Sequence, residues 1–296
     1  MKQAFLTVGL MALFLLPSIS RAEVTSFEQA DTTPNLDLPR QAAGQSADLF
    51  SAFFGLDSMP RLANVICQSA RGQDGMPVIF STEIDHTTLQ VGDFRVLSRS
   101  GAVGKMHCAS FLPATDPGEL RTVLLIGEFG PGDTDPPARV EIIGHIHSID
   151  STLDFQGAAV DVTPLDPGPT LILAERYDPN LPDAGLGRRR TDGDDCPAEG
   201  TVQAVRVVWA GGVTLANGDE PGEAERQLYR VTVSAPDGGL REVAPMALAD
   251  LGDGDNNHLL CLDTPDMPVS VFFPAGVFTD PNDDLNPDTS ISLTPM

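Results

Sequence analysis

The stretch CQSARGQDGMPVIF (residues 67–80) has a counterpart later in the chain, CPAEGTVQAVRVVW (residues 196–209). When the two stretches are aligned, Cys67 matches Cys196, and the alternating apolar run that ends each stretch matches the other. Further matches follow in the same order: FRV at 94 with YRV at 229, LLIGEF at 124 with LLCLDT at 259, and VDVTPL at 160 with ISLTPM at 291. An ordered series of matches at nearly constant spacing predicts an internal duplication.

The repeat divides the chain into two units, residues 58–166 and 168–296, joined by the stiff, turn-forming sequence DPGP. Both units contain short runs rich in β-branched and aromatic residues, separated by clusters of Gly, Pro, Asp and Asn. About seven such runs per unit is typical of an antiparallel β-sandwich. We therefore predict an all-β protein of two tandem antiparallel β-sandwiches.

The N-terminal region has the pattern of a secretory signal over residues 1–22. Lys2 is followed by an apolar run too short to span a membrane, and small residues precede a predicted cleavage after Ala22. Residues 23–47 are polar and predict a disordered leader. The apolar spacing in ADLFSAFFGLD predicts one short helix over residues 48–57.

The net charge of the chain excludes some classes of function. The chain has 42 acidic and 18 basic residues and a formal net charge of −24. Such a balance excludes general nucleic-acid binding, which needs a positive surface. No later segment is long and apolar enough for a membrane span. With the signal, these features indicate a periplasmic or secreted protein whose partner is a protein or polysaccharide of the cell envelope.

Two stretches resemble a known family. VIFSTEIDHTTLQVGDFRV (residues 78–96) is similar to the opening of bacterial Ig-like domains of surface-layer and adhesin proteins. The residues that fit the pattern are Ile84, Asp85, Thr88, Leu89, Asp93, Phe94 and Val96. GVFTDPNDDLNPDTSISL (residues 276–293) resembles the end of such a domain, although an aspartate stands where the family has glycine. The resemblance implies an Ig-like fold for both units, a fold that serves as spacer, adhesion module and enzyme accessory alike.

The acidic loop DPNDDLNPD is the preferred candidate for calcium. Asp280, Asn282 and Asp284 alternate as hard oxygen ligands, and Asp288 is placed to close the shell. Two prolines restrict the loop, which lowers the ordering cost of binding. If either acidic loop of the chain binds Ca²⁺, we expect it to be this one, with weak affinity; we expect no required cofactor.

A second acidic stretch, DLGDGDNNH (residues 250–258), fails the EF-hand pattern because His258 stands where glycine is needed. The matching part of the first unit reads as a turn feeding a strand. We therefore expect mainly a turn before a buried strand, with a weak calcium site as the alternative.

Signals for catalysis are weak. GHIHS places His145 and His147 on one face of a predicted strand, where they could share a transition metal, but spacing identifies no third ligand. GRRRTDGDD (residues 187–195) predicts a locally salt-bridged loop, with a partner-docking patch as the alternative. No G-x-S-x-G or phosphate-binding loop is present in the sequence. We predict a binding or structural module without catalytic activity; the alternative is a secreted metal-assisted hydrolase.

Four cysteines in an exported chain predict two disulfides. One bridge per repeat unit gives Cys67–Cys108 and Cys196–Cys261. By restricting the unfolded chain, each bridge should stabilise its unit by about 4 kcal/mol. Replacing both cysteines of a pair with serine should lower the free energy of unfolding in urea by about this amount. Non-reducing peptide mapping that links Cys67 to Cys196 would contradict the pairing.

Overall fold

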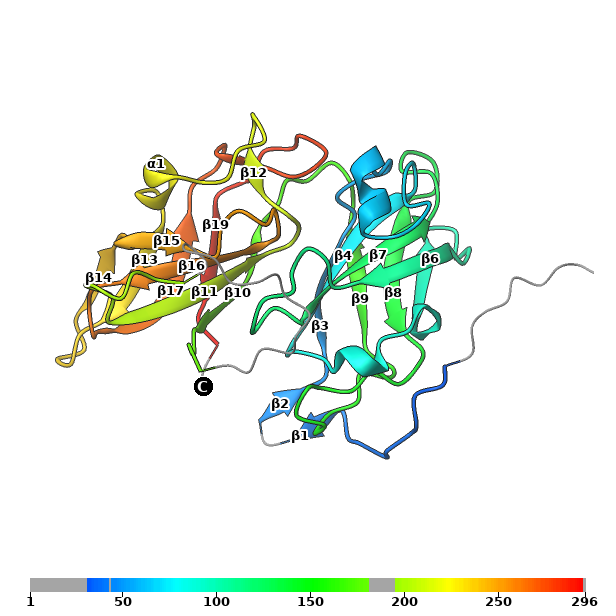
Figure 1. The fold of residues 1–296 in the computed structure, drawn as a ribbon, viewed down its shortest axis with the longest axis horizontal. Helices are drawn as coiled ribbons and strands as arrows, with labels where there is room; N and C mark the ends of the chain where they lie inside the picture. Colours follow the sequence, from blue (N-terminus) through cyan, green and yellow to red (C-terminus); the bar gives the residue numbers. More distant parts are fainter. Residues whose placement is uncertain (1–30, 43, 181–194, 295–296) are drawn as a thin grey trace, which may run out of the picture.

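The computed structural model describes residues 31–42, 44–180 and 195–294, and it is built almost entirely of β-strands arranged in two lobes (Figure 1). The prediction of an all-β protein is confirmed. Among the described residues, no helix has the length and apolar character needed to cross a bilayer. The predicted signal peptide and nearly all of the arginine-rich loop lie outside the described residues.

The first lobe is one seven-stranded sheet. Its strands are β3 (Leu49–Phe53), β4 (Asp74–Phe80), β5 (Phe94–Ser98), β6 (Lys105–Ser110), β7 (Thr122–Glu128), β8 (Pro137–Ile142) and β9 (Ala159–Thr163). Their order is β5-β8-β9-β3-β4-β7-β6, and only the β3–β9 pair is parallel. The two edges approach each other, because Gly104 N donates to Val96 O at 2.8 Å just before β6. The sheet therefore nearly closes into a barrel around Phe80 and its aromatic neighbours Phe94 and Phe155.

The second lobe contains two four-stranded sheets. Its strands are β10 (Leu171–Arg176), β11 (Gln203–Trp209), β12 (Thr214–Leu215), β13 (Arg230–Ser234), β14 (Leu240–Val243), β15 (Ala247–Ala249), β16 (Asn257–Leu262), β17 (Met267–Phe273), β18 (Phe278–Thr279) and β19 (Thr289–Ser292). One sheet has the order β10-β11-β16-β15 and the other β14-β13-β17-β19, and β12 pairs with β18. The core between them holds Trp209, Tyr229, Phe273 and Phe278.

Short elements complete the described chain. They are β1 (Gln41–Ala42), β2 (Gln45–Ser46), the 3-10 helices η1 (Arg61–Val65), η2 (His86–Thr88) and η3 (Val91–Asp93), and the helix α1 (Glu223–Arg226). The β1–β2 hairpin projects below the first lobe in Figure 1.

The two lobes share a strand order. The row β3-β4-β7-β6 corresponds to β10-β11-β16-β15, and β5-β8-β9 corresponds to β13-β17-β19. The registers agree with the sequence repeat, since Val78 lies opposite Val123 and Val207 lies opposite His258. The sheet geometry differs, because β9 is bonded to β3 in the first lobe while the second lobe keeps two sheets. The prediction of tandem Ig-like sandwiches related by duplication is therefore not confirmed.

Two predictions for the N-terminal region are wrong. The segment predicted as a helix over residues 48–57 contains strand β3, which pairs with β4 on one side and β9 on the other. A short apolar run is compatible with either a helix or a strand. Here β4 and β9, one on each side, supply partners for its backbone hydrogen bonds. The described part of the predicted disordered leader is ordered: Gln90 Nε2 donates to Asp31 Oδ1 at 3.0 Å, and Ala47 N donates to Arg40 O at 2.7 Å. The first lobe thus begins well before residue 58.

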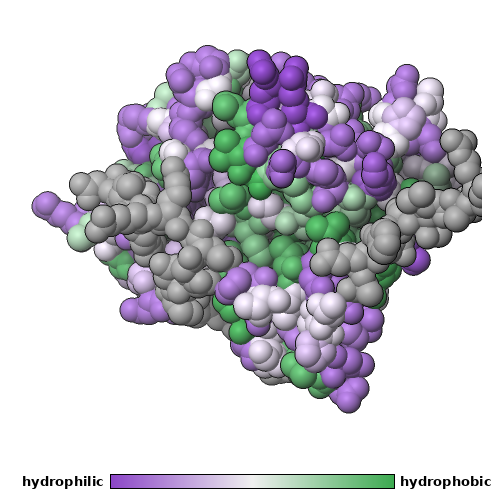
Figure 2. Space-filling view, turned by 45° about the vertical axis from the view of Figure 1, so that its right-hand side comes forward, coloured by the Kyte–Doolittle hydropathy of each residue, from purple (hydrophilic) through white to green (hydrophobic). Residues whose placement is uncertain are grey.

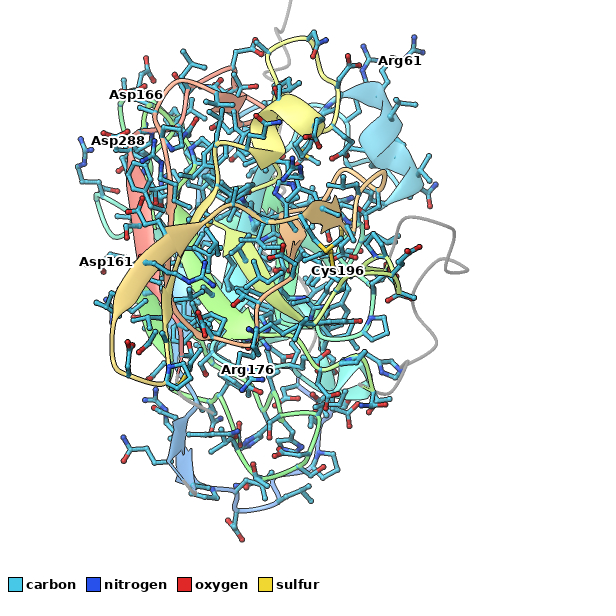
Figure 3. All side chains as sticks on the ribbon, turned by 90° about the vertical axis from the view of Figure 1, so that its left-hand side faces the viewer. Arg61, Asp161, Asp166, Arg176, Cys196 and Asp288 are labelled. Carbon is cyan, nitrogen blue, oxygen red and sulfur yellow. A yellow bond between two sulfur atoms is a disulfide. The ribbon has the colours of Figure 1, made fainter. Side chains whose placement is uncertain are left out.

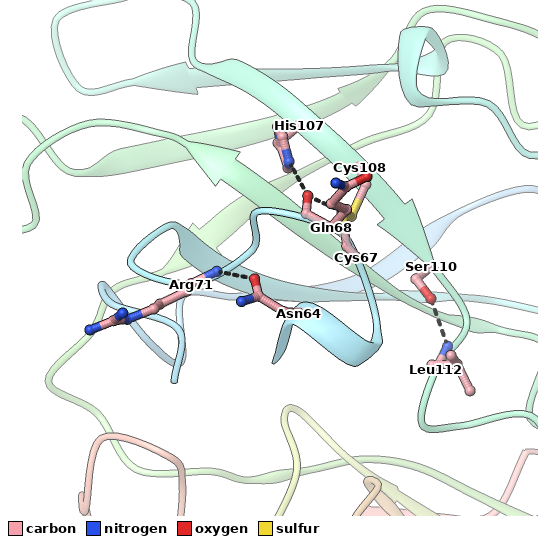
Figure 4. The surroundings of a disulfide bond; sticks show 8 residues. All are labelled: Asn64, Cys67, Gln68, Arg71, His107, Cys108, Ser110 and Leu112. Atoms are coloured by element: carbon pink, nitrogen blue, oxygen red, sulfur yellow. Dashed lines mark hydrogen bonds between the residues drawn. A yellow bond between two sulfur atoms is a disulfide. The ribbon is translucent and has the colours of Figure 1, made fainter. Parts of the chain in front are cut away.

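Both predicted disulfides, Cys67–Cys108 and Cys196–Cys261, are confirmed. The first ties the turn after η1 to strand β6 (Figure 4). Next to it, His107 Nε2 lies 2.7 Å from Gln68 O. The second bridge anchors the start of the described C-terminal segment to the central strand β16.

A polar chain runs through the second core. Trp209 Nε1 donates to the Tyr229 hydroxyl at 3.2 Å, and that hydroxyl lies 2.8 Å from His258 Nδ1. A hydroxyl that already accepts from Trp209 donates to His258, so Nδ1 is the acceptor of a neutral ring. Burial lowers the pKa of His258 to about 4.

This burial predicts acid destabilisation. The unfolded chain protonates His258 near its ordinary pKa of about 6.5, whereas the folded chain does so near 4, so stability is lost as the pH falls through this window. The contribution is about 3 kcal/mol. In urea denaturation from pH 7 to pH 4, a His258→Gln variant should lack this part of the decline. The same exchange at exposed His86 should leave the decline unchanged, and equal declines in wild type and His258→Gln would contradict the assignment.

Candidate metal centre at the junction of the lobes

The lobes meet along the first sheet of the second lobe. Ile79 of β4 packs against Leu173 and Val208. Across the same junction, Arg121 Nη2 forms an ion pair with Glu175 Oε1 at 3.0 Å. The contact is therefore both apolar and ionic.

Arg206 of β11 is the central cation of this junction and is only 1% exposed. Its Nη2 donates to Pro117 O of the first lobe at 2.6 Å, and its guanidinium lies 4.9 Å from the centre of the Tyr177 ring. Burial lowers its pKa, but the carboxylates of Glu119, Asp250 and Glu175 outweigh burial and raise it. Arg206 is therefore charged and faces acidic groups from both lobes.

The acidic groups come from two loops. Asp116 and Glu119 form a DPGE turn, in which Asp116 N donates to Glu119 Oε2 at 2.8 Å. Asp250, Asp253 and Asp255 come from the loop between β15 and β16. One carboxylate oxygen from each of Asp116, Glu119 and Asp253 lies within 4.8 Å of the others. The junction thus gathers carboxylates that are far apart in the sequence.

The single charge of Arg206 is outnumbered by these carboxylates. Burial raises the pKa of Glu119 well above its ordinary value, and the nearby charges of Asp255 and Asp250 raise it further. Burial also raises the pKa of Asp255, with Asp253 and Asp250 as the neighbouring charges. A cluster of this kind holds either protons or a cation.

Two oxygens identify where that cation or proton would sit. Among the described residues, Glu119 Oε1 and Asp250 Oδ2 are buried without a hydrogen-bond partner, and so are Arg206 Nε and Nη1 beside them and Asp280 Oδ2 in the other acidic loop. Asp255, in contrast, accepts from Asn257 N at 2.7 Å and from Asn257 Nδ2 at 3.0 Å. Buried oxygens without a partner are costly, so a ligand at this position would remove a real penalty.

The spacing fits calcium. Ca²⁺ binds oxygen at about 2.3–2.6 Å, so two oxygens on one ion lie at most about 5 Å apart. The 4.8 Å limit on the Asp116, Glu119 and Asp253 oxygens satisfies this condition. The ligand set is purely oxygen, which is the type that Ca²⁺ prefers.

The loop predicted to bind calcium is arranged differently. Asp280 Oδ1 accepts from Asn282 N and Asp284 N, and Asn282 Nδ2 donates to Asp284 Oδ2 at 2.8 Å. The structure thus brings these three residues together. Asp288 Oδ1 instead accepts from Ala275 N, and Asp288 is labelled near the edge of the molecule in Figure 3. Calcium binding by this loop stays a prediction.

The histidine pair is placed differently from the prediction. His145 and His147 follow β8 rather than lying in a strand, and His147 is only 3% exposed. Both approach Asp154, which the sequence did not single out. The turn residues Asp116 and Glu119 were also missed, because within their own unit they look like ordinary turn chemistry.

An apolar cavity of about 310 Å³ lies beside the acidic junction. Its walls include Phe53, Met59 and Phe111 from the first lobe and Pro281 from the second, and Asp255 lies at its edge. Figure 2 shows hydrophobic residues gathered in a furrow down the middle of one face, between hydrophilic rims. The junction therefore combines charge with room for a small apolar group.

No known protein family matches this chain, and no curated protein matches it. Fold and site define a two-lobed all-β protein with one disulfide per lobe and a buried acidic junction. Its function is argued from this geometry.

Removing the central cation tests the junction. An Arg206→Met variant leaves the buried carboxylates without their counter-charge, so its free energy of unfolding in EDTA should fall by about 3–5 kcal/mol. Arg176→Met, on the exposed end of β10 and labelled in Figure 3, should change it by no more than about 0.5 kcal/mol. Adding Glu119→Gln to Arg206→Met should restore part of the loss. Equal effects of the two arginine variants would contradict the electrostatic account.

Proposed function

We propose that this protein is an exported binding or structural module of two Ig-like domains, held in a fixed relation by Ca²⁺ at the acidic junction. The observation that carries the proposal is the pair of buried carboxyl groups of Glu119 and Asp250, which come from different lobes, lie close enough to share a proton, and have one oxygen each, Oε1 and Oδ2, with no other partner among the described residues. A cation bound to both would join the lobes directly.

Strand order supports the Ig-like class. In Ig domains, strands A, B, E and D form one sheet and C, F and G form the other. Lettering β3 to β9 as A to G gives these two rows, A-B-E-D and C-F-G, and the second lobe gives the same rows. The agreement of this order with the sequence repeat also supports descent by duplication.

Export is supported by the disulfides. Both indicate an oxidising environment outside the cytoplasm. The N-terminal signal pattern and the acidic composition point the same way. Extracellular calcium modules have dissociation constants of about 10⁻⁴–10⁻³ M, the range we propose here.

Calcium fits the site better than magnesium. The carboxylates sit on two separate loops, and Ca²⁺ accepts irregular sets of six to eight oxygens. Mg²⁺ needs near-octahedral geometry at about 2.0–2.1 Å and usually keeps several waters, so it is a poorer match for a set of protein carboxylates. A bound Ca²⁺ would make the relative position of the lobes, and with it the apolar cavity between them, depend on the ion.

One observation favours the alternative, a metal-assisted hydrolase. His145 Nδ1 lies 2.6 Å from Asp154 Oδ2, and both residues border a polar cavity of about 280 Å³. In such an enzyme a metal-bound water would be the nucleophile. The binding module remains the leading proposal because the junction joins acidic groups from both lobes, and its partner is a protein or polysaccharide of the cell envelope.

Calcium titration of the full mature chain tests the proposal. With a dissociation constant of about 10⁻⁴ M, 10 mM Ca²⁺ should stabilise the fold by about 2.7 kcal/mol and raise the melting temperature by several degrees. Mg²⁺ at the same concentration should give a smaller shift. In EDTA, Glu119→Gln should still fold, because Asp250 and Glu175 remain as counter-charges for Arg206, yet it should lose the calcium shift.

Asp284→Asn is the matched control, since it removes one charge from the other acidic loop. It should keep the calcium shift. A shift that survives Glu119→Gln and disappears in Asp284→Asn would place calcium in the 280–288 loop, and an equal response to Mg²⁺ would reject a calcium site at the junction.

A further inference from the structure

A second cluster of possible metal ligands lies in the first lobe, in the segment after β8. His145 and His147 flank the buried residue Ile146, and His147 forms an isolated antiparallel bridge with Asp154. The backbone is fixed at each point: His145 N donates to Asp31 Oδ2 at 2.7 Å, and Asp154 N donates to Pro39 O at 3.1 Å. The three side chains are therefore held together by main-chain contacts that do not depend on a ligand.

The second ring nitrogen of His147, Nε2, is buried and has no hydrogen-bond partner among the described residues. The side chain of His147 is 4% exposed. The nearest acidic atom is Asp154 Oδ2 at 4.0 Å, too far for a hydrogen bond. A ring nitrogen buried in this way, facing a carboxylate, is placed to receive a ligand between them.

We propose that His145, His147 and Asp154 bind a divalent transition-metal ion, for which Zn²⁺ is the probe. One potential ligand atom from each residue lies within 4.8 Å of the other two. In a tetrahedral zinc site with bonds of about 2.0–2.1 Å, ligand atoms lie roughly 3.3 Å apart. Asp154 Oδ2 now lies 2.6 Å from His145 Nδ1 and 4.0 Å from His147 Nε2. Both distances lie within about 0.7 Å of the zinc value.

The ligand atoms of this cluster differ from those of the acidic junction, so the two sites should prefer different metal ions. Two imidazole nitrogens with one carboxylate suit Zn²⁺ and other late first-row metals, whereas Ca²⁺ prefers oxygen alone. The surroundings are anionic as well. Asp93 is fully buried near His145, Asp154 and Asp31, and among the described residues its Oδ1 has no hydrogen-bond partner. Carboxylates around a histidine pair favour a bound cation over an empty pair of rings.

The site has an open side. His145 and Asp154 border the polar cavity of about 280 Å³, whose other walls include Asn35, Arg40 and Gln156. Three protein ligands leave one tetrahedral position, and the cavity supplies access for the ion and space for a water molecule there. The segment 31–40, predicted to be disordered, forms one wall, so the site is complete only when this segment is folded against the lobe.

Zinc binding to the full mature chain tests the proposal. Calorimetry in saturating Ca²⁺ should show one Zn²⁺ per chain, and Co²⁺ used in its place should give the visible absorption of a tetrahedral complex. His147→Gln and His145→Gln should each weaken Zn²⁺ binding at least 100-fold. His86→Gln and His107→Gln, which remove histidines outside the cluster, should leave the affinity unchanged. Circular dichroism and melting curves would show that each variant is folded.

A variant of the proposed calcium site, compared with a variant of the histidine cluster, shows which of the two sites binds Zn²⁺. Zn²⁺ binding that persists in Glu119→Gln and disappears in His147→Gln supports the histidine cluster, whatever the calcium titration shows. Zn²⁺ binding that disappears in Glu119→Gln but persists in His147→Gln would assign the ion to the acidic junction and overturn the proposal. Failure of the wild-type chain to bind Zn²⁺ at 100-fold excess would overturn it as well.

Discussion

The ion pairing around Arg206 is the constraint on which the arrangement of the lobes depends. A guanidinium that is 1% exposed cannot be left without counter-charge, because its desolvation would cost more than the lobes gain from their small apolar contact. Its counter-charges come from both sides, Glu119 from the first lobe and Asp250 from the second. The hydrogen bond to Pro117 O then fixes the DPGE turn against β11. Electrostatic contacts thus fix the relative position of the two lobes together with apolar packing.

The same constraint leaves an excess of negative charge. One buried arginine faces Glu119 and Asp250, Asp255 adds a further negative charge near Glu119, and Arg121 is already paired with Glu175. Like charges buried together repel, and their pKa values rise in consequence. A bound divalent cation, as proposed above, would relieve this repulsion. The histidine cluster follows the same logic with softer ligands, since a buried ring nitrogen and a carboxylate face each other across 4.0 Å.

Much of the fold could be predicted from local pattern. The alternating run before Phe80 and the one before Trp209 became β4 and β11, and the cysteines that precede these runs form one disulfide in each lobe. The short run around Phe53 could not be assigned, because helical and strand spacing coincide over so few residues and its two partner strands decide the outcome. The leader was misjudged for a similar reason: its order comes from contacts with Gln90, which lies far away in the sequence.

The sequence by itself determined the all-β class, the disulfide pairs and the acidity of the loops. These properties depend on residue type and short-range spacing, which are readable along the chain. Only the tertiary structure decided which acids meet. It placed Glu119 beside Asp250 and Asp154 beside the histidines, because side chains distant in sequence become neighbours only when sheets pack and loops cross between them. Burial and neighbouring charges set the pKa of a carboxylate and the free energy of burying it, and neither can be read from the residues next to it in the sequence.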